Sequence, residues 1–281
     1  MQTISLPSEM RAGSRRAREA GRKIGFVPTM GSLHEGHLSL IREARRLSEW
    51  TVVSIFVNPA QFGPTEDLDA YPRYLAADLE LCRRESVDAV FHPPEDAMYA
   101  AGCSTQVEET TLSRGMCGVS RPGHFRGVTT VVAKLFNIVE PDVAVFGRKD
   151  AQQARVIERM VRDLNFPVRI VIAPIVRESD GLAMSSRNRY LSREERRQAL
   201  CLREALNLAE ELAARGETAA SFIEAEMRKL IEARPSARVD YIGIVDFDTL
   251  EPVERVKEGT LLALAVWIGG TRLIDNTVIE R

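Results

Sequence analysis

"KIGFVPTMGSLHEGHLSLIREARRLSEWTVVSIFVNP", residues 23–59, is the stretch that decides the fold. Its two ends, 23–29 and 51–59, are short apolar runs of the kind that form buried strands. The residues between them, 37–49, carry apolar side chains at the i, i+3, i+4 spacing of an amphipathic helix. This order predicts two strands joined by a helical crossover, which makes the strands parallel.

The same alternation continues to about residue 175. Three more apolar strands and three more helices are expected, the strands at 87–94, 141–147 and 167–176 and the helices at 74–86, 125–139 and 150–164. Near-continuous apolar strands of this kind are typical of a parallel sheet that is covered on both faces. Residues 1–175 are therefore predicted to form a Rossmann-like, doubly wound α/β domain with five strands.

The pattern changes after residue 175, where a smaller α+β domain is predicted over residues 176–281. Its two charged helices and three antiparallel strands are expected at 192–216, 218–234, 239–246, 261–269 and 271–280. Ser192 and Glu195 have the spacing of a capping box at the start of the first of these helices.

The composition excludes several classes of function. The 281 residues include 38 Lys and Arg against 40 Asp and Glu, so no overall basic charge favours nucleic acid. The four cysteines are scattered without a CxxC pair, and we expect reduced thiols in a cytosolic protein. No secretory signal is expected, and no apolar run reaches the roughly 20 residues of a membrane helix.

Polar, glycine-containing segments follow four of the predicted strands. They are "PTMGSLHEGH" at 28–37, "NPAQFG" at 58–63, "GRKDAQQ" at 147–153 and "RESDGLAMSSRNRY" at 177–190. Because doubly wound sheets bind ligands at the carboxyl ends of their strands, we expect these segments to form a ligand site.

His34 and His37 are predicted on the first turn of a helix, facing the same way. Free N–H groups and a partial positive charge make a helix N-terminus suitable for phosphate, and two imidazoles there could donate to charge developing in a transition state. Gly31 and Gly36 would let a ligand approach the backbone. Two alternatives remain open: a zinc site, for which no third ligand stands nearby, and a pair of structural histidines.

Other candidates lie on the later segments. Lys149 could neutralise a phosphate oxygen, and Arg187 in the loop 184–187 could bind phosphate in bidentate fashion. Asn58 and Gln61 are neutral amides that could hold a small polar substrate. Plain alternatives exist: Lys149 could be a solvated surface lysine, the loop 184–187 a serine-rich linker and Asn58 a turn cap.

The basic loop "SRPGHFRG", residues 120–127, places His124 between Arg121 and Arg126. Two arginines, two glycines and a proline predict a rigid loop, and a functional and a structural role are equally compatible with it.

These segments, together with "RLIDN" at 272–276, resemble the pantoate–β-alanine ligase family of the HxGH nucleotidyltransferase superfamily. The HxGH motif alone is also found in adenylyltransferases and class I aminoacyl-tRNA synthetases, whereas "NPAQF" and "SSRNRYL" are far more specific. "MSSR" takes the place of the superfamily's lysine–serine motif, a variant that this family shares.

The resemblance implies an ATP-dependent reaction in two steps. The carboxylate of pantoate attacks the α-phosphorus of ATP, and the amine of β-alanine then attacks the resulting pantoyl adenylate to release AMP and pantothenate. It also implies Mg²⁺ carried on the ATP phosphates rather than in a protein metal site, a cytoplasmic homodimer, and no nucleic-acid or membrane partner.

The resemblance further assigns residues to roles. His37, His34 and Lys149 are expected to be catalytic, with His37 as the acid. Gln61, Gln153 and Asn58 are expected to hold pantoate, with Gln61 also near β-alanine. The ATP-binding residues implied are Met30, Gly31, Ser32, Leu33, His34, Glu35, Gly36, His37, Gly147, Arg148, Lys149, Asp150, Val176, Met184, Ser185, Ser186 and Arg187. Residues 1–175 would bind the nucleotide and pantoate, and residues 176–281 would form a lid.

Two competing functions make different demands. An RNA-associated module, such as a synthetase fragment, predicts a basic face and an anticodon-type domain, which a net charge of −2 disfavours. An adenylyltransferase acting on a phosphorylated substrate would need further basic residues, and it gives no role to Gln61 and Gln153.

Overall fold

The computed structural model describes residues 1–64 and 66–280. Contacts divide the chain into two compact units. The first unit comprises Met1–Thr110, Arg121–Arg148 and Gln153–Pro174, and the second comprises Thr111–Ser120, Lys149–Gln152 and the chain from Ile175 onward.

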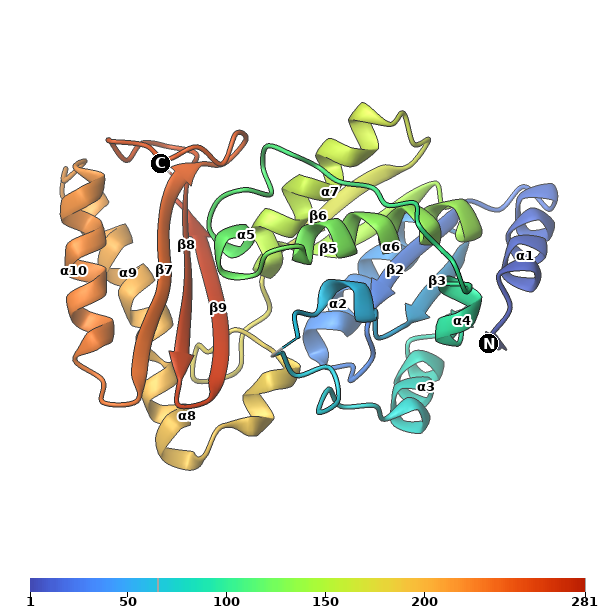
Figure 1. Ribbon diagram of the computed structural model, residues 1–281, viewed down its shortest axis with the longest axis horizontal. Helices are drawn as coiled ribbons and strands as arrows, with labels where there is room; N and C mark the ends of the chain where they lie inside the picture. The colour runs from blue at the N-terminus through green and yellow to red at the C-terminus, as the bar shows by residue number, and fades with distance from the viewer. Residues whose placement is uncertain (65, 281) are drawn as a thin grey trace. The chain divides into compact units, whose positions relative to one another are not determined.

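A six-stranded, all-parallel sheet forms the centre of the first unit, in the order β1-β4-β3-β2-β5-β6 (Figure 1). The strands are β1 (Gln2–Ile4), β2 (Ile24–Thr29), β3 (Trp50–Ile55), β4 (Ala89–Phe91), β5 (Val143–Gly147) and β6 (Arg169–Ala173). The predicted doubly wound α/β fold is confirmed, and all five expected strands are present. The sixth, β1, was not predicted because three residues carry no readable periodicity.

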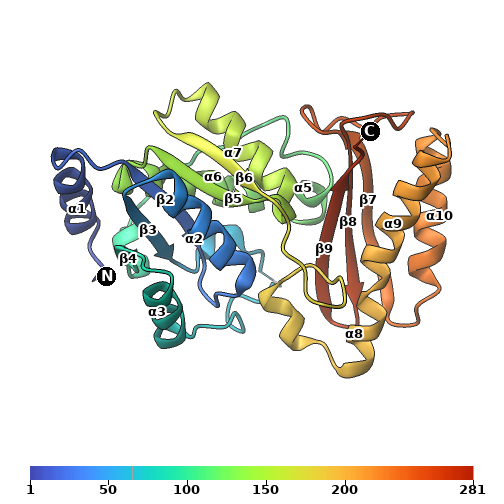
Figure 2. The same cartoon turned by 180° about the vertical axis from the view of Figure 1, so that it is seen from behind.

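Helices cover both faces of this sheet. They are α1 (Pro7–Glu19), α2 (Glu35–Leu47), α3 (Leu75–Arg84), the short α4 (Glu95–Met98), α6 (His124–Val139) and α7 (Ala151–Asp163). Figure 1 shows α6 in front of the sheet, and Figure 2, from behind, shows α2. Helix α1 was also not predicted: four arginines dominate its sequence, whereas its buried face consists of Met10, Gly13, Ser14 and Ala17.

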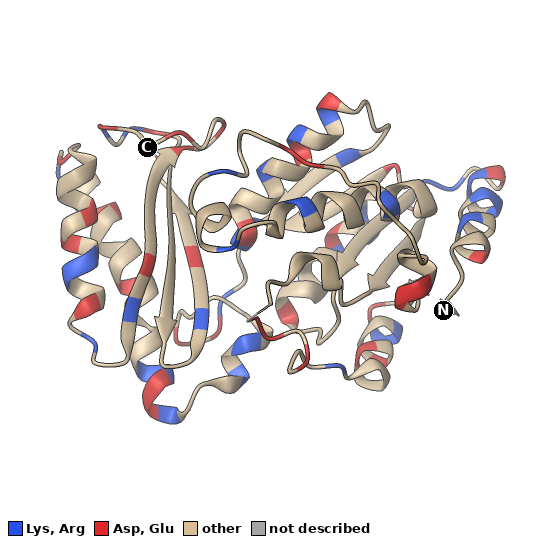
Figure 3. Ribbon diagram, viewed as in Figure 1, with Lys and Arg blue, Asp and Glu red and all other residues tan. Residues whose placement is uncertain are grey.

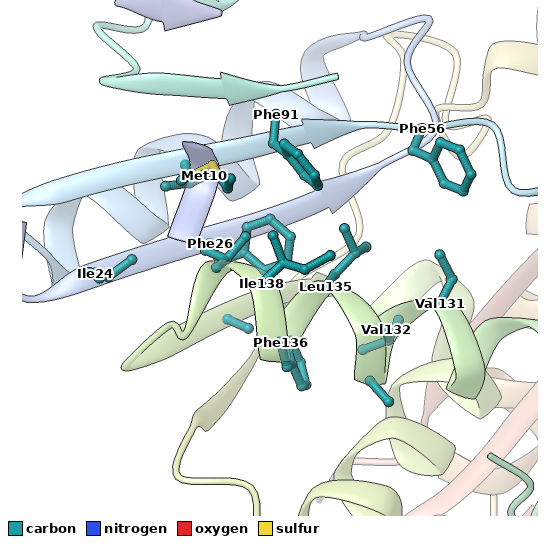
Figure 4. Packing of buried hydrophobic residues seen from close by; sticks show 14 of the residues in the cluster. Met10, Ile24, Phe26, Phe56, Phe91, Val131, Val132, Leu135, Phe136 and Ile138 are labelled. Carbon is teal, nitrogen blue, oxygen red and sulfur yellow. The ribbon is translucent and has the colours of Figure 1, made fainter. Parts of the chain in front are cut away.

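Side-chain alternation along the strands divides the core into two layers. Phe26 and Phe91 pack with Leu135 of α6 and Met10 of α1 on one face (Figure 4). The neighbour of Phe26, Val27, belongs to the other layer, with α2 and α3. A charged substitution on either face would therefore be buried, which explains the near-continuous apolar strands.

The strand order reverses between β2 and β5. From β2 the chain moves outward through β3 to β4, while β5 and β6 lie on the other side. The register pairs Thr29 with Ile55, so β2 and β3 end side by side. In doubly wound sheets such a reversal is where the ligand crevice forms.

The second unit contains a three-stranded antiparallel sheet, in the order β7-β8-β9. Its elements are α5 (Cys117–Ser120), α8 (Arg193–Ala199), α9 (Cys201–Ala214), α10 (Ala220–Glu232), β7 (Ala237–Asp246), β8 (Thr260–Ile268) and β9 (Thr271–Val278). Figures 1 and 2 show α9 and α10 lying along one face of the sheet, where Leu206, Met227 and Leu264 share a buried core.

The predicted helix at 192–216 is two helices, α8 and α9, which meet at Leu200. The capping box at its start is confirmed: Ser192 Oγ accepts from the Glu195 N–H at 3.2 Å, and Glu195 Oε2 accepts from the Ser192 N–H at 2.8 Å.

Lys and Arg are interspersed with Asp and Glu along the surface helices (Figure 3). On α10, for example, Arg228 lies between Glu224 and Glu232 at one-turn spacing and contacts both. Within residues 1–64 and 66–280, no helix is long and apolar enough to cross a membrane.

Candidate active site

The loop after β2 is held by a buried carboxylate. Asp78 of α3 is 2% exposed and accepts hydrogen bonds from the backbone N–H groups of Ser32 at 2.8 Å and Leu33 at 2.7 Å. Gly31 has φ +84°, and a Cβ there would lie 2.9 Å from Asp78 Oδ2 and 3.0 Å from Ile55 Cγ2. Only glycine fits, because both the backbone conformation and the space exclude a side chain.

Sequence reasoning missed Asp78, although a signal was present. Asp78 lies with Leu75, Leu79 and Cys82 on the apolar stripe of α3 and is buried there beside Cys82. A carboxylate on such a stripe needs strong hydrogen-bond donors, which the loop supplies.

The two histidines lie at the start of α2, as their spacing predicts. His34 is the N-cap residue and His37 the third residue of the helix, with ring centroids 4.1 Å apart. The His34 N–H donates to His37 Nδ1 at 3.3 Å. A ring nitrogen that accepts carries no proton, so neutral His37 keeps its proton on Nε2, where it can be donated to a ligand.

Gln61 follows β3, on a short 3₁₀ turn (Pro59–Gln61), and its amide is oriented by Asn58. Asn58 Nδ2 donates to the Gly127 carbonyl at 3.1 Å and to Gln61 Oε1 at 3.0 Å. Because the Gly127 carbonyl can only accept, the atom of Asn58 that faces it must be the amide nitrogen, Nδ2. Gln61 Oε1 is thereby the acceptor, and Gln61 Nε2 lies 3.2 Å from Met30 Sδ.

A further donor completes the orientation of Asn58. The Tyr99 hydroxyl donates to Asn58 Oδ1 at 2.8 Å, and burial raises the pKa of Tyr99 to about 12, so this donor keeps its proton. Asn58 is 1% exposed, and both hydrogens of its amide are engaged. Its side chain therefore contacts Gln61 rather than solvent.

Gly127 lets α6 pack directly against the turn that carries Gln61. A Cβ at Gly127 would lie 2.2 Å from the Ala60 oxygen and 2.6 Å from the Gln61 nitrogen. Both atoms are backbone, so neither can move aside, and any other residue at this position would displace the turn.

The basic loop that begins at Arg121 holds the main chain of Gln61. His124 is 8% exposed, and its Nδ1 donates to the Gln61 carbonyl at 2.8 Å. Arg121 donates to His124 Nε2 at 3.0 Å and pairs with Glu66, its Nε lying 2.8 Å from Oε1. Burial alone would raise the pKa of Glu66, but the hydrogen bonds from Arg121 outweigh it and lower the pKa below its ordinary value. These contacts give the loop a positioning role.

The segment after β5 contains two adjacent glutamines in different environments. Gln152, in the second unit, is 7% exposed; it donates to the carbonyls of Leu112 and Gly115, both at 2.9 Å, and accepts from the Cys117 N–H at 3.1 Å. Gln153, in the first unit, is partly exposed and makes no side-chain hydrogen bond in the described chain. Of the two, only Gln153 is available to a ligand.

Lys149 and the loop 184–187 both belong to the second unit. Lys149 follows Arg148 on a 3₁₀ turn, and its carbonyl accepts from Asn276 Nδ2 at 2.9 Å. In the loop, the Met184 N–H donates to the Val176 carbonyl at 3.0 Å, and Ser185 Oγ accepts from the Arg187 N–H at 3.2 Å.

The first unit thus brings His34, His37, Met30 and Gln61 to the ends of two adjacent strands, and the end of β5 with Gly147 is next to β2. In the described parts of the chain, no group of three or more His, Cys, Asp or Glu side chains could hold a metal ion. The zinc alternative for the histidine pair therefore has no third ligand among these residues.

A parallel α/β sheet with a helix N-terminus and paired imidazoles at its reversal point defines a Rossmann-like protein of the nucleotide-binding class. The family model for pantoate-beta-alanine ligase matches residues 2–278. The chain belongs to the pantoate–β-alanine ligase family.

Relatives and solved structures agree over almost the whole length. The chain is 58% identical to pantothenate synthetase of Moorella thermoacetica, covering 94% of this chain and 93% of the relative. It is 56% identical to that of Thermotoga petrophila, covering 99% and 100%. The crystal structure of pantothenate synthetase from Thermus thermophilus superposes with a TM-score of 0.95 at 45% identity, with both chains fully covered.

A second crystal structure is informative about ligands. Pantoate-beta-alanine ligase from Francisella tularensis, complexed with beta-gamma ATP and beta-alanine, matches with a TM-score of 0.79 at 32% identity. The match covers 100% of this chain and 98% of that one.

Proposed function

We propose that this protein condenses pantoate with β-alanine in an ATP-dependent ligase reaction that passes through pantoyl adenylate. The observation that carries the proposal is the position of Gln61 beside the phosphate-type loop, with its Nε2 3.2 Å from Met30 Sδ. The Gln61 amide can hydrogen-bond to a carboxylate and to hydroxyl groups, and it lies next to the N-terminus of α2, which is suited to the α-phosphate.

In the first step, a carboxylate oxygen of pantoate bonds to the α-phosphorus of ATP, and the bond from that phosphorus to pyrophosphate breaks. Negative charge grows on the phosphoryl oxygens. The positive N-terminal end of α2, His37 Nε2–H and His34 stabilise this charge.

In the second step, the amine of β-alanine bonds to the acyl carbon, and the bond from that carbon to the AMP oxygen breaks. The amine loses a proton and AMP leaves as its anion. Neither step needs a covalent nucleophile, so catalysis rests on positioning and charge stabilisation.

The remaining roles are divided between the two units of the chain. Lys149 and Arg187 neutralise phosphate charge from the second unit, and Gln61 and Gln153 hold pantoate from the first. Asn58 acts through Gln61 as a positioning residue, because both of its amide hydrogens are engaged. Mg²⁺ is proposed to enter with ATP, carried on its phosphates, as the family resemblance implies.

The protein is further proposed to act as a homodimer in the cytoplasm, as the family resemblance implies. Sedimentation equilibrium should return twice the 31.4 kDa chain mass. A single-chain mass at micromolar concentration would contradict the dimer.

Residues 176–281 are proposed to close as a lid when ATP binds, which would shield the labile adenylate from water. Tryptic cleavage between Ser179 and Asn188 should therefore slow when ATP is added. Cleavage after Arg215, which is 76% exposed at the end of α9, serves as the control and should not change. Equal cleavage with and without ATP in the first segment would contradict closure.

An activity assay tests the proposal against its competitors. With ATP, pantoate and β-alanine, AMP and pyrophosphate should form in equal amounts. An adenylyltransferase would leave AMP attached to its product, and an RNA-associated module would release neither compound in response to pantoate.

A further inference from the structure

Asp275 and Asn276 of the "RLIDN" segment have no part in the reaction as described so far. They are adjacent on β9 and are 2% and 3% exposed. Two buried polar side chains in succession are costly unless each finds partners. What these partners are decides what the pair does.

The two side chains point to opposite faces of the sheet, because successive residues of a strand alternate. Asp275 is paired with Leu264, whose side chain lies in the core with α9 and α10. Asn276 is paired with Ala263 and so faces the other way. Thr277 returns to the helix side, where it donates to Glu210 of α9 at 2.6 Å.

On its face, Asp275 holds the hairpin that precedes the loop 184–187. Its carboxylate binds the Arg177 guanidinium in bidentate fashion, at 2.7 and 3.0 Å. Arg177 also donates to the Gly181 carbonyl at 3.1 Å, and the Glu178 N–H donates to the Leu182 carbonyl at 2.8 Å. The chain leaves this hairpin directly into the loop 184–187.

On the opposite face, Asn276 holds the main chain of Lys149. Its Nδ2 donates to the Lys149 carbonyl at 2.9 Å, and a carbonyl can only accept, so the amide orientation is fixed. Gly243, Ala263 and Asn276 form one row across the three strands. A Cβ at Gly243 would lie 2.6 Å from Met116 Sδ, so small residues on this row leave room for the segments 111–120 and 149–152.

We propose that Asp275 and Asn276 are positioning residues that attach both nucleotide-binding segments of the second unit to one strand. Lys149 and the loop 184–187 are thereby fixed relative to each other, although they lie more than 30 positions apart in the chain. This inference rests on the proposed function, since it assumes that both segments contact ATP.

Stability alone would be served by any hydrogen-bond partner, including one within the sheet. Arg272, on the same strand, shows the plain alternative: it pairs with Asp240 of β7 at 2.8 Å, within the sheet itself. Asp275 and Asn276 instead each reach a different segment that carries candidate phosphate ligands.

The test measures ATP binding by titration calorimetry, which does not depend on turnover. Asn276→Ala should weaken ATP binding on the order of tenfold, because Lys149 loses its fixed main chain and with it part of a charge-assisted contact. Thr277→Val, which removes a hydrogen bond to α9 from the next residue of the strand, should leave ATP binding unchanged. Pantoate use should be unaffected in both variants.

A double-mutant cycle identifies the route of the effect. If Asn276 acts through Lys149, then Lys149→Ala with Asn276→Ala should bind ATP no more weakly than Lys149→Ala alone. For Asp275, Asp275→Asn should also weaken ATP binding. Should that variant fail to fold, Arg177→Lys keeps the charge but loses the bidentate geometry, and should give the same result.

The outcomes separate the two proposals. Additive losses in the cycle, equal weakening by Thr277→Val, or unchanged ATP binding in Asn276→Ala would each overturn the positioning role. If the wild-type protein fails to form AMP and pyrophosphate yet shows the predicted cycle, the proposed function falls and the positioning role stands.

Discussion

Replacing His37 by alanine is expected to slow formation of pantoyl adenylate by about 10²–10³-fold. The imidazole donates from Nε2 because its Nδ1 accepts the His34 N–H at 3.3 Å. A donor fixed in this way needs no reorganisation when charge develops on the α-phosphate. The rate is measured as pyrophosphate release from ATP and pantoate in a single turnover without β-alanine.

The fold should survive this change. The variant loses the long hydrogen bond from the His34 N–H to His37 Nδ1, which is worth about 0.5–1.5 kcal/mol of unfolding free energy. Arg46→Ala is the matched control on α2, because the Arg46 side chain is 68% exposed and pairs with Glu43 on the same helix. Near-normal adenylate formation by His37→Ala would refute the assigned role.

Replacing Gln61 by alanine is expected to weaken the use of pantoate by about 1.5–3 kcal/mol, or roughly 10- to 150-fold in kcat/KM. The loss is large because a polar group of the substrate is left without its partner in a site where Gln61 is only 9% exposed. ATP binding should change little. Gln153→Ala should behave in the same way.

A graded variant strengthens the test of Gln61. Tyr99→Phe removes the hydroxyl that donates to Asn58 Oδ1 and so loosens the Gln61 amide without touching it. We expect a smaller loss in the same direction, about 0.5–1.5 kcal/mol. An unchanged Michaelis constant for pantoate in Gln61→Ala, or equal losses for pantoate and ATP, would exclude the assignment.

Much of the fold could be predicted because its signals are local. The apolar runs of β2 and β3 and the helical spacing between them are each contained in fewer than 15 residues. The exceptions have physical reasons. β1 has three residues, and α1 buries Gly13 and Ser14 on a face that shows little hydrophobicity.

In the candidate site, too, the parts that could be predicted are those with a local signal in the sequence. His34 and His37 could be found because helix periodicity makes them neighbours. The contacts that hold the site are distant in the chain, so no local pattern pairs their members: Asp78 is 46 residues from Ser32, and Asn58, which orients Gln61, is 69 from Gly127 and 41 from Tyr99. Only the folded chain shows that a buried aspartate and a packed glycine hold the reacting groups.

Long-range contacts also explain why the two segments 111–120 and 149–152, which belong to the second unit, could not be assigned to it from the sequence. No local pattern shows that 111–120 and 149–152 pack on a sheet whose first strand begins at Ala237. The small residues that admit them, Gly243 and Ala263, read in the sequence as ordinary strand residues. Their meaning depends on Met116, more than a hundred residues earlier in the chain.

The fate of a pantoate carboxylate oxygen tests the central claim most directly. With pantoate labelled by ¹⁸O in its carboxylate, attack on the α-phosphorus transfers one labelled oxygen to AMP when β-alanine displaces it. Mass spectrometry should therefore find one ¹⁸O atom in each AMP formed and none in pyrophosphate. Label in inorganic phosphate together with ADP, or AMP without label, would contradict the acyl-adenylate route.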